Sequence, residues 1–366
     1  MKLATSIKSS LSAVQRYQYK TVLVISVLWT VIDILYWIHY MHLPGDARND
    51  STFVVLNDKA IVLRIIIVWG MSLLMSYILI FRLRLLLRDY PLVLNLFIKT
   101  ALLVITSFFM NFLLHVTYSL FVIGISLWQS LYNFYRDSTS GLWVFSHSVG
   151  WIILFIITQL GIELNEKYSP GVFFDILLGR YINPRVENRI VMFLDLTDST
   201  PIAEKLGSKR YFSFIRDFIF YVSSALLEYD GRIYQYVGDE IVVSWKYSIR
   251  NTRKCILSLV AARKLLHKNA NYFKRKYGIM PEFKAGIHVG DVTVGEIGLI
   301  KKDLAMSGDT MNTAARIRTS CTELKHPFVA SREFVEGATT HWQSKSLGSI
   351  ELKGKSNEVE LFALML

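Results

Sequence analysis

Apolar residues are concentrated in the first 162 positions, where they form long runs separated by short polar segments. Four runs are long enough for a transmembrane helix, which needs about 20 apolar residues to cross a bilayer. They predict a bundle of four transmembrane helices over residues 21–41, 61–81, 97–119 and 143–162. The ends of the third helix are open, because apolar residues continue from 92 to 133. The alternative is a topology of six crossings in which that run is divided in two.

The charges between these runs predict how the helices are oriented. The tail over residues 1–20 carries four basic residues, and the second connection carries Arg82, Arg84 and Arg88. In the other connections, basic and acidic residues are mixed. Because positively charged loops stay in the cytoplasm, both ends of the chain are predicted to lie on the cytoplasmic side, with four crossings or with six.

After residue 162 the pattern changes from membrane-like to globular. Residues 163–184 mix charge with the short amphipathic segment FFDILLGRYINP, which predicts a helical linker that transmits a signal. From 185 to 366, segments typical of strands and helices alternate, and a strand pair over 282–298 is predicted to turn at Gly290-Asp291. The order is βαββαβ with extra strands, which predicts an α+β ferredoxin-like domain.

The composition agrees with a membrane part joined to a globular part. Hydrophobic residues make up 52% of the chain and charged residues 19%, against roughly 25% charged in a soluble domain. The formal net charge of +12 favours acidic partners such as anionic lipid or nucleotide phosphates. The basic residues are scattered, so nucleic-acid binding is not expected. The two cysteines have neither metal-ligand nor disulfide spacing.

Two aspartates in the globular part are candidate metal ligands. Asp195 ends an apolar strand, and Asp239 lies at the tip of the following hairpin. Neighbouring strands would bring both carboxylates to one edge of the sheet, where paired oxygens suit Mg²⁺ or Mn²⁺ bound with a polyphosphate. Ser199 and Thr200 open a short helix after Asp195, and its first amides are candidates for binding phosphate oxygens.

A second candidate site lies in the segment GDTMNTAAR. Asn312 and Arg316 are four residues apart and therefore share one helical face. An amide beside a guanidinium is suited to orienting a ribose and neutralising charge that develops on a phosphate. The alternative interpretation is an exposed polar face without a function.

Taken together, residues 184–366 resemble the catalytic domain of the class III nucleotidyl cyclases, including bacterial members anchored in a membrane. Five motifs in the family's order carry the resemblance: FLDLTDST, YVGDE, GIHVGDVTVGEIG, GDTMNTAARI and ELKGK. The resemblance implies a lyase that converts ATP into 3',5'-cyclic AMP and pyrophosphate, by attack of the ribose 3'-oxygen on the α-phosphate. It also places the helices in the cell (inner) membrane and the catalytic domain in the cytoplasm.

The family's roles transfer to matching positions of this chain. Asp195 and Asp239, helped by the Leu196 carbonyl, would hold two Mg²⁺ or Mn²⁺ ions per active site. Asn312 would orient the ribose, and Arg316 would stabilise the transition state. Lys353 would contact the triphosphate, and Lys355 is the alternative for that role. Because family members build each site across a dimer interface, the resemblance implies a homodimer.

Two positions depart from the family's adenine-reading pattern. Gln235 stands where adenylate cyclases carry lysine, and Ala305 stands where they carry aspartate, threonine or serine. A glutamine side chain both donates and accepts, and alanine offers no side-chain hydrogen bond, so the contacts that select the base are altered. A guanylate cyclase or one of mixed specificity is therefore an alternative to an adenylate cyclase.

Four histidines mark a candidate sensor in the membrane part. In the predicted orientation, His39, His42, His115 and His147 lie near the outer ends of their helices. If they converge, they would bind a metal or haem, or titrate as a pH sensor. The alternative is that they are interfacial side chains at the polar boundary.

Two further classes of function compete with a membrane-bound cyclase. A non-enzymatic pseudocyclase receptor would keep the fold and lose the reaction, although all metal and catalytic positions are intact. A diguanylate cyclase has a hairpin similar to YVGDE, but it would leave Asn312 and Arg316 unexplained.

Overall fold

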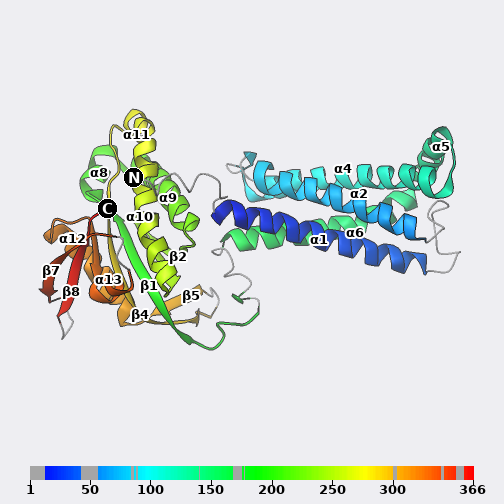
Figure 1. The fold of residues 1–366 in the computed structure, drawn as a ribbon. Coiled ribbons are helices and arrows are strands. Elements are labelled where there is room, and N and C mark those ends of the chain that lie inside the picture. Colours follow the sequence, from blue (N-terminus) through cyan, green and yellow to red (C-terminus); the bar gives the residue numbers. More distant parts are fainter. Residues whose placement is uncertain are drawn as a thin grey trace. The chain divides into compact units, whose positions relative to one another are not determined.

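The computed structural model describes residues 13–42, 57–83, 86–87, 90–139, 141–167, 175–176, 178–299, 303–338, 342–351 and 358–366. Within these ranges, the side chains of 13–14, 40–41, 92, 141–148 and 165–167 are outside the description. The chain forms a helical unit over Gln15–Glu166 and a second unit that includes Lys167–Leu366 (Figure 1).

The helical unit consists of long apolar helices and one short amphipathic helix. Its elements are α1 (Ala13–Met41), α2 (Asp58–Tyr77), η2 (Ile78–Leu83), α4 (Leu92–Tyr118), η3 (Ser119–Ile123), α5 (Leu127–Ser138) and α6 (Gly141–Lys167). Two of them, η2 and η3, are π-helical continuations of α2 and α4.

Three helical stretches are long and apolar enough to cross a membrane: Gln15–His39, Asp58–Leu83 and Val93–Ile123. A fourth apolar stretch, Val149–Leu164, lies within α6. The 12 residues of α5 are fewer than a crossing needs, so the apolar run over 92–133 contains one helix of crossing length rather than two.

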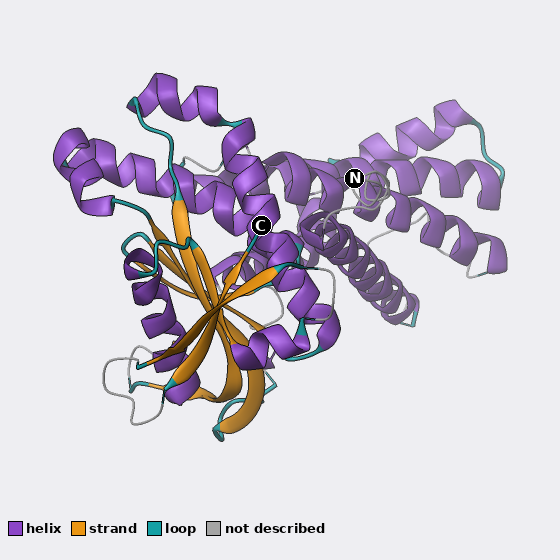
Figure 2. Cartoon of the chain, turned by 60° about the vertical axis from the view of Figure 1, so that its left-hand side comes forward, coloured by secondary structure: helices purple, strands orange, loops and turns teal. Residues whose placement is uncertain are grey.

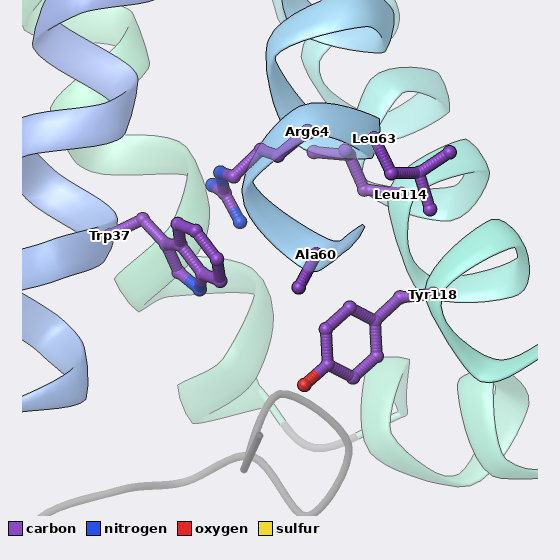
Figure 3. A pocket seen from close by; sticks show the side chains of 6 residues that line it. All are labelled: Trp37, Ala60, Leu63, Arg64, Leu114 and Tyr118. Atoms are coloured by element: carbon purple, nitrogen blue, oxygen red, sulfur yellow. The ribbon is translucent and has the colours of Figure 1, made fainter. Parts of the chain in front are cut away.

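Two ion pairs join helices inside this unit. Arg64 of α2 donates to both carboxylate oxygens of Asp33 on α1, at 2.6 and 2.9 Å, and its guanidinium lies 5.0 Å from the Trp37 ring centre. Lys99 of α4 pairs with Glu163 of α6 at 3.1 Å. Charges inside an apolar bundle are costly unless they are neutralised, so these pairs stabilise the helix arrangement. Arg64 also lines a small pocket between α1, α2 and α4 (Figure 3).

The second unit is built on one mixed sheet in the order β2-β3-β1-β4-β6-β8-β7, with β5 paired to β4. The strands are β1 (Arg185–Leu196), β2 (Arg232–Val237), β3 (Glu240–Lys246), β4 (Phe283–Ile297), β5 (Asp303–Ser307), β6 (Phe328–Ser331), β7 (Ser344–Ile350) and β8 (Val359–Leu364). The helices are α8 (Ser199–Leu206), α9 (Ser208–Glu228), α10 (Ile249–Lys268), α11 (Ala270–Tyr277), α12 (Asp309–Glu323) and α13 (Arg332–Gly337). The predicted βαββαβ order, with additional strands, is confirmed.

Alternating residues of β1 divide the core between the two faces of the sheet. Ile190, Met192 and Leu194 pack in a large cluster with side chains of α9 and α10. Val191 packs on the other face with Met311 of α12. Helices therefore cover both faces, and the strands fan out between them in Figure 2. By the same alternation, Asp195 faces the α12 side.

The predicted turn at Gly290-Asp291 is wrong. β4 runs without interruption from Phe283 to Ile297, and Gly290 pairs with Arg189 of β1 in a regular ladder. A side chain at Gly290 would lie 2.5 Å from Thr310 Oγ1 of α12. The glycines of this strand thus allow a helix to approach closely, and the hairpin partner of β4 is β5.

Candidate active site

Three carboxylates meet where β1 ends and the β2–β3 hairpin turns. Leu194 pairs with Ile241, so the antiparallel register continues with Asp195 opposite Glu240. Asp239 follows Gly238, which takes the left-handed backbone (φ 62°) that a glycine adopts easily in a tight turn. The strand order therefore places Asp195 and Asp239 at one end of the sheet, as expected from the sequence.

These acids share a partly desolvated environment. Burial raises the pKa of Asp195 above its ordinary value, and the adjoining charge of Asp239 raises it further, against the influence of Arg318. Burial also raises the pKa of Glu240. Both shifts mean that the ionised carboxylates repel one another and are incompletely solvated, which favours a bound cation.

Two basic side chains of the same protomer reach Asp195. Arg318 of α12 lies with Nη1 3.2 Å from Asp195 Oδ2 and with Nη2 2.5 Å from Glu240 Oε2. Lys284 of β4 places Nζ 3.6 Å from the same Asp195 oxygen. Arg318, Lys284 and Glu240 were not predicted from the sequence. Their positions depend on which face of a helix or strand meets the β1 end, and the motif spacing alone does not give this.

The predicted phosphate-binding segment follows Asp195 directly. Leu196 is buried, and α8 begins at Ser199, so the first helical amides come three residues after the end of β1. Thr200 is exposed. Tyr211 of α9 is close to this segment, and burial, followed by the charge of Asp239, raises the pKa of its hydroxyl.

Asn312 and Arg316 lie on a different side of α12 from Arg318. At 100° per residue, Arg316 is about 40° from Asn312 but about 200° from Arg318. Among the described residues, the Asn312 and Arg316 side chains make no hydrogen bond or ion pair, and Asn312 is exposed. The helix face that packs on the sheet carries Ala314, which is fully buried. The Asn–Arg face is therefore available to another surface.

The two predicted base-reading positions lie on strands that are not paired with each other, because β2 pairs with β3 and β5 pairs with β4. Gln235 is exposed on β2, and Ala305 lies on β5. The adjacent residues are in contact, because the Met306 backbone N–H donates to the Tyr234 hydroxyl at 3.0 Å. Lys353, the predicted triphosphate contact, is outside the described residues.

The aspartate pair is suited to a divalent metal ion. Within the described ranges, Asp239 Oδ2 is buried without a hydrogen-bond partner, and Asp195 adjoins it. No group of three or more His, Cys, Asp or Glu side chains suited to a metal occurs among the residues the structure describes. Glu240 is held by Arg318 instead. A metal ion held here would have two side-chain ligands, and backbone, water or phosphate oxygens would complete its coordination.

The candidate histidine cluster is not assembled by the three histidines whose side chains are described. His115 is fully buried and its ring lies 5.4 Å from that of Phe134. His39 is exposed on α1, and His42 is exposed directly after the end of α1. The side chain of His147 is outside the description.

The C-terminal unit matches a known family. The family model of the adenylate and guanylate cyclase catalytic domain matches residues 182–365, half of the chain. The chain is 29% identical to adenylate cyclase 2 of Rhizobium meliloti over 206 residues, 56% of this chain and 57% of that protein. It is 24% identical to guanylate cyclase 2D of Rattus norvegicus over 201 residues, 53% of this chain and 18% of that protein.

A solved structure shares the fold. A bacterial light-regulated adenylyl cyclase superposes with a TM-score of 0.52 at 18% identity, covering 59% of this chain and 64% of that one. The chain therefore belongs to the adenylate and guanylate cyclase catalytic domain family. It covers less than two thirds of the length of each of these three proteins.

Proposed function

We propose that this protein is a membrane-anchored adenylate cyclase, which converts ATP into 3',5'-cyclic AMP and pyrophosphate. The observation that carries the proposal is the adjoining pair Asp195 and Asp239. Burial, followed by the charge of Asp239, raises the pKa of Asp195, and Asp239 Oδ2 is buried with no hydrogen-bond partner among the described residues. In a cyclase domain, such a pair is suited to holding metal ions against a nucleotide triphosphate. Of the two curated relatives above, the adenylate cyclase has the higher identity.

In this proposal the residues of one protomer bind the metal ions and the phosphates. Asp195, Asp239 and the Leu196 carbonyl are the metal ligands, and the N-terminal amides of α8, near Ser199 and Thr200, donate hydrogen bonds to the phosphate oxygens. When bound, two Mg²⁺ or Mn²⁺ ions lower the pKa of the ribose 3'-hydroxyl and neutralise phosphate oxygens.

The second half of the site comes from a partner subunit. Arg318 contacts Asp195 of its own chain. Arg316 lies about 200° around α12 from Arg318, so the Asn312–Arg316 face is directed away from Asp195. A homodimer places this face opposite the partner's metal ligands and generates two equivalent sites. Asn312 then orients the ribose, and Arg316 neutralises charge on the phosphate during attack. Lys353 is assigned to the triphosphate.

The base pocket is assigned to the contact between β2 and β5. Gln235 and Ala305 flank the Tyr234–Met306 hydrogen bond, so both lie at one place on the protomer. Gln235 can donate to adenine N1 through its amide, which is the same type of contact that a lysine makes. Because the amide also accepts, GTP is the competing substrate.

The helical unit is the proposed membrane anchor and sensor. Its three crossing-length helices and the apolar stretch of α6 correspond to the four predicted spans within residues 21–162. The positive loops support a cytoplasmic N-terminus and catalytic domain, beneath the cell (inner) membrane. Residues 163–184 then connect the anchor to the catalytic domain.

The assay that tests this function uses detergent-purified protein with Mn²⁺ and either ATP or GTP, with quantified cyclic products. We expect cyclic AMP to be the main product. The Asp195→Asn and Asp239→Asn variants each remove a metal ligand and should lose at least about 100-fold in rate. Cyclic GMP as the main product would favour a guanylate cyclase. No product with either nucleotide would favour a pseudocyclase.

A further inference from the structure

An arginine of the same chain occupies one side of the candidate metal site. The Arg318 guanidinium bridges Asp195, at 3.2 Å, and Glu240, at 2.5 Å, and thus joins the end of β1 to the start of β3. All three side chains are largely buried, with 24% of the Arg318 side chain and 14% of each acid exposed. Charge pairs at this depth are screened less by solvent than pairs on the surface.

The packing of α12 on β4 fixes the position of Arg318. A Cβ at Gly286 would collide with the Arg318 backbone and would come within 2.7 Å of the Ala314 carbonyl oxygen. The helix therefore packs directly on the strand at this point. Arg318 approaches Asp195 from a rigid part of the fold, and Lys284 adds a second positive charge 3.6 Å from Asp195.

We propose that Arg318 is an internal counter-cation that competes with the divalent metal ion for Asp195. This inference rests on the proposed function, because the metal ion concerned is the one assigned to Asp195 and Asp239. Without a metal, Arg318 compensates the repulsion between the acids. When a metal ion is bound, the Arg318 guanidinium either stays beside the ion and repels it, or gives up its contact with Asp195. Either outcome weakens metal binding.

A consequence is that the site binds metal weakly until a nucleotide arrives. The triphosphate carries several negative charges and supplies further oxygen ligands, so it offsets the charge of Arg318. Metal and nucleotide then fill the site together. Arg318 is a positioning residue in this account, since it acts through Asp195 and Glu240.

Metal binding without nucleotide tests the proposal directly. The full-length protein in detergent micelles is titrated with Mn²⁺ at mildly alkaline pH, where the acids are ionised, and free Mn²⁺ is measured from its electron paramagnetic resonance signal. Arg318→Gln removes the charge and should tighten Mn²⁺ binding about tenfold, equivalent to about 1.4 kcal/mol. Arg318→Lys keeps one positive charge beside Asp195, so its Mn²⁺ affinity should stay within about twofold of wild type.

Two controls make the result specific. Arg332→Gln removes an exposed charge that pairs with Glu336 and Glu360, away from the aspartates, and should leave Mn²⁺ affinity unchanged. Asp195→Asn should abolish the binding event that Arg318→Gln strengthens.

The possible results separate this inference from the proposed function. If Arg318→Gln binds Mn²⁺ no more tightly than wild type, or if Arg318→Lys tightens binding equally, Arg318 is not a competing cation. Should Arg318→Gln fail to fold, equal affinity in wild type and Arg318→Lys supports the inference, and tighter binding in the lysine variant contradicts it. Mn²⁺ binding that Asp195→Asn leaves intact contradicts the metal site itself.

Discussion

Replacing Gly286 by alanine should destabilise the catalytic unit more than any other glycine substitution in β4. The new methyl group would overlap the Arg318 backbone nitrogen and would lie 2.6 Å from the Arg318 Cα. These are backbone atoms of a helix packed on the sheet, so no side-chain rotation relieves the contact. Overpacking of this kind lowers the free energy of unfolding by about 1–3 kcal/mol. Because the α12 backbone is rigid, we expect the loss for Gly286→Ala to lie near the upper limit.

Two further glycines of the same strand form a graded series. At Gly290 the methyl group would meet Thr310 Oγ1 at 2.5 Å, and rotation of that side chain would break its 2.7 Å hydrogen bond to the Asp291 carbonyl. The lost bond costs about 1 kcal/mol. At Gly295 the nearest atoms belong to Pro184 and lie 3.2 Å away, so we expect a loss below about 1 kcal/mol.

Thermal unfolding of the purified protein in detergent measures this series. A loss of about 3 kcal/mol corresponds to a fall in the melting temperature of about 6–12 °C for a domain of this size. The expected order of melting temperatures is wild type, Gly295→Ala, Gly290→Ala and then Gly286→Ala. A Gly286→Ala protein that melts with wild type, or an inverted order, would refute the close packing of α12 on β4.

Substitutions at three other positions give further predictions. Asp33→Asn leaves the Arg64 charge without its carboxylate partner inside the helical unit and should cost about 3 kcal/mol in thermal unfolding, part of which Arg64→Gln recovers in the double variant. The pKa of Asp217 lies below its ordinary value. Burial acts to raise this pKa, but hydrogen bonds from Lys276 and two tyrosines lower it by more. Ionised Asp217 should therefore raise the free energy of unfolding by about 2 kcal/mol relative to Asp217→Asn. This stabilisation should be complete above about pH 4 and should disappear in denaturation measured at lower pH. Gln235→Lys should raise the ratio of kcat/KM for ATP over GTP about tenfold, and Gln235→Glu should lower it.

The sequence predicted the parts of the site that depend on strand order and local motifs. Asp195 follows an apolar strand and Asp239 follows a glycine between two strands, and antiparallel pairing of those strands brings the acids together. The i, i+4 spacing of Asn312 and Arg316 likewise determines a shared helical face. Neither inference needs knowledge of how distant elements pack.

The errors arise where distant elements pack together. Glycine at a turn and glycine beneath a helix look the same in a sequence, so Gly290 was assigned to a turn although it lies under Thr310. Arg316 and Arg318 differ only in the side of α12 on which they lie. Which of them reaches Asp195 can be predicted only when the face of α12 that packs on β4 is known. The ion pairs at Asp195 depend on this tertiary contact.

Mixed dimers test the central claim most directly, namely that the metal aspartates and the Asn–Arg face act together in one site. Asp195→Asn and Arg316→Ala chains are each expected to be inactive alone. If they are co-expressed and pair randomly, half of the dimers have one intact site, so about a quarter of wild-type cyclic AMP formation should return. No activity above that of the separate variants would contradict the account, given that both chains fold and pair.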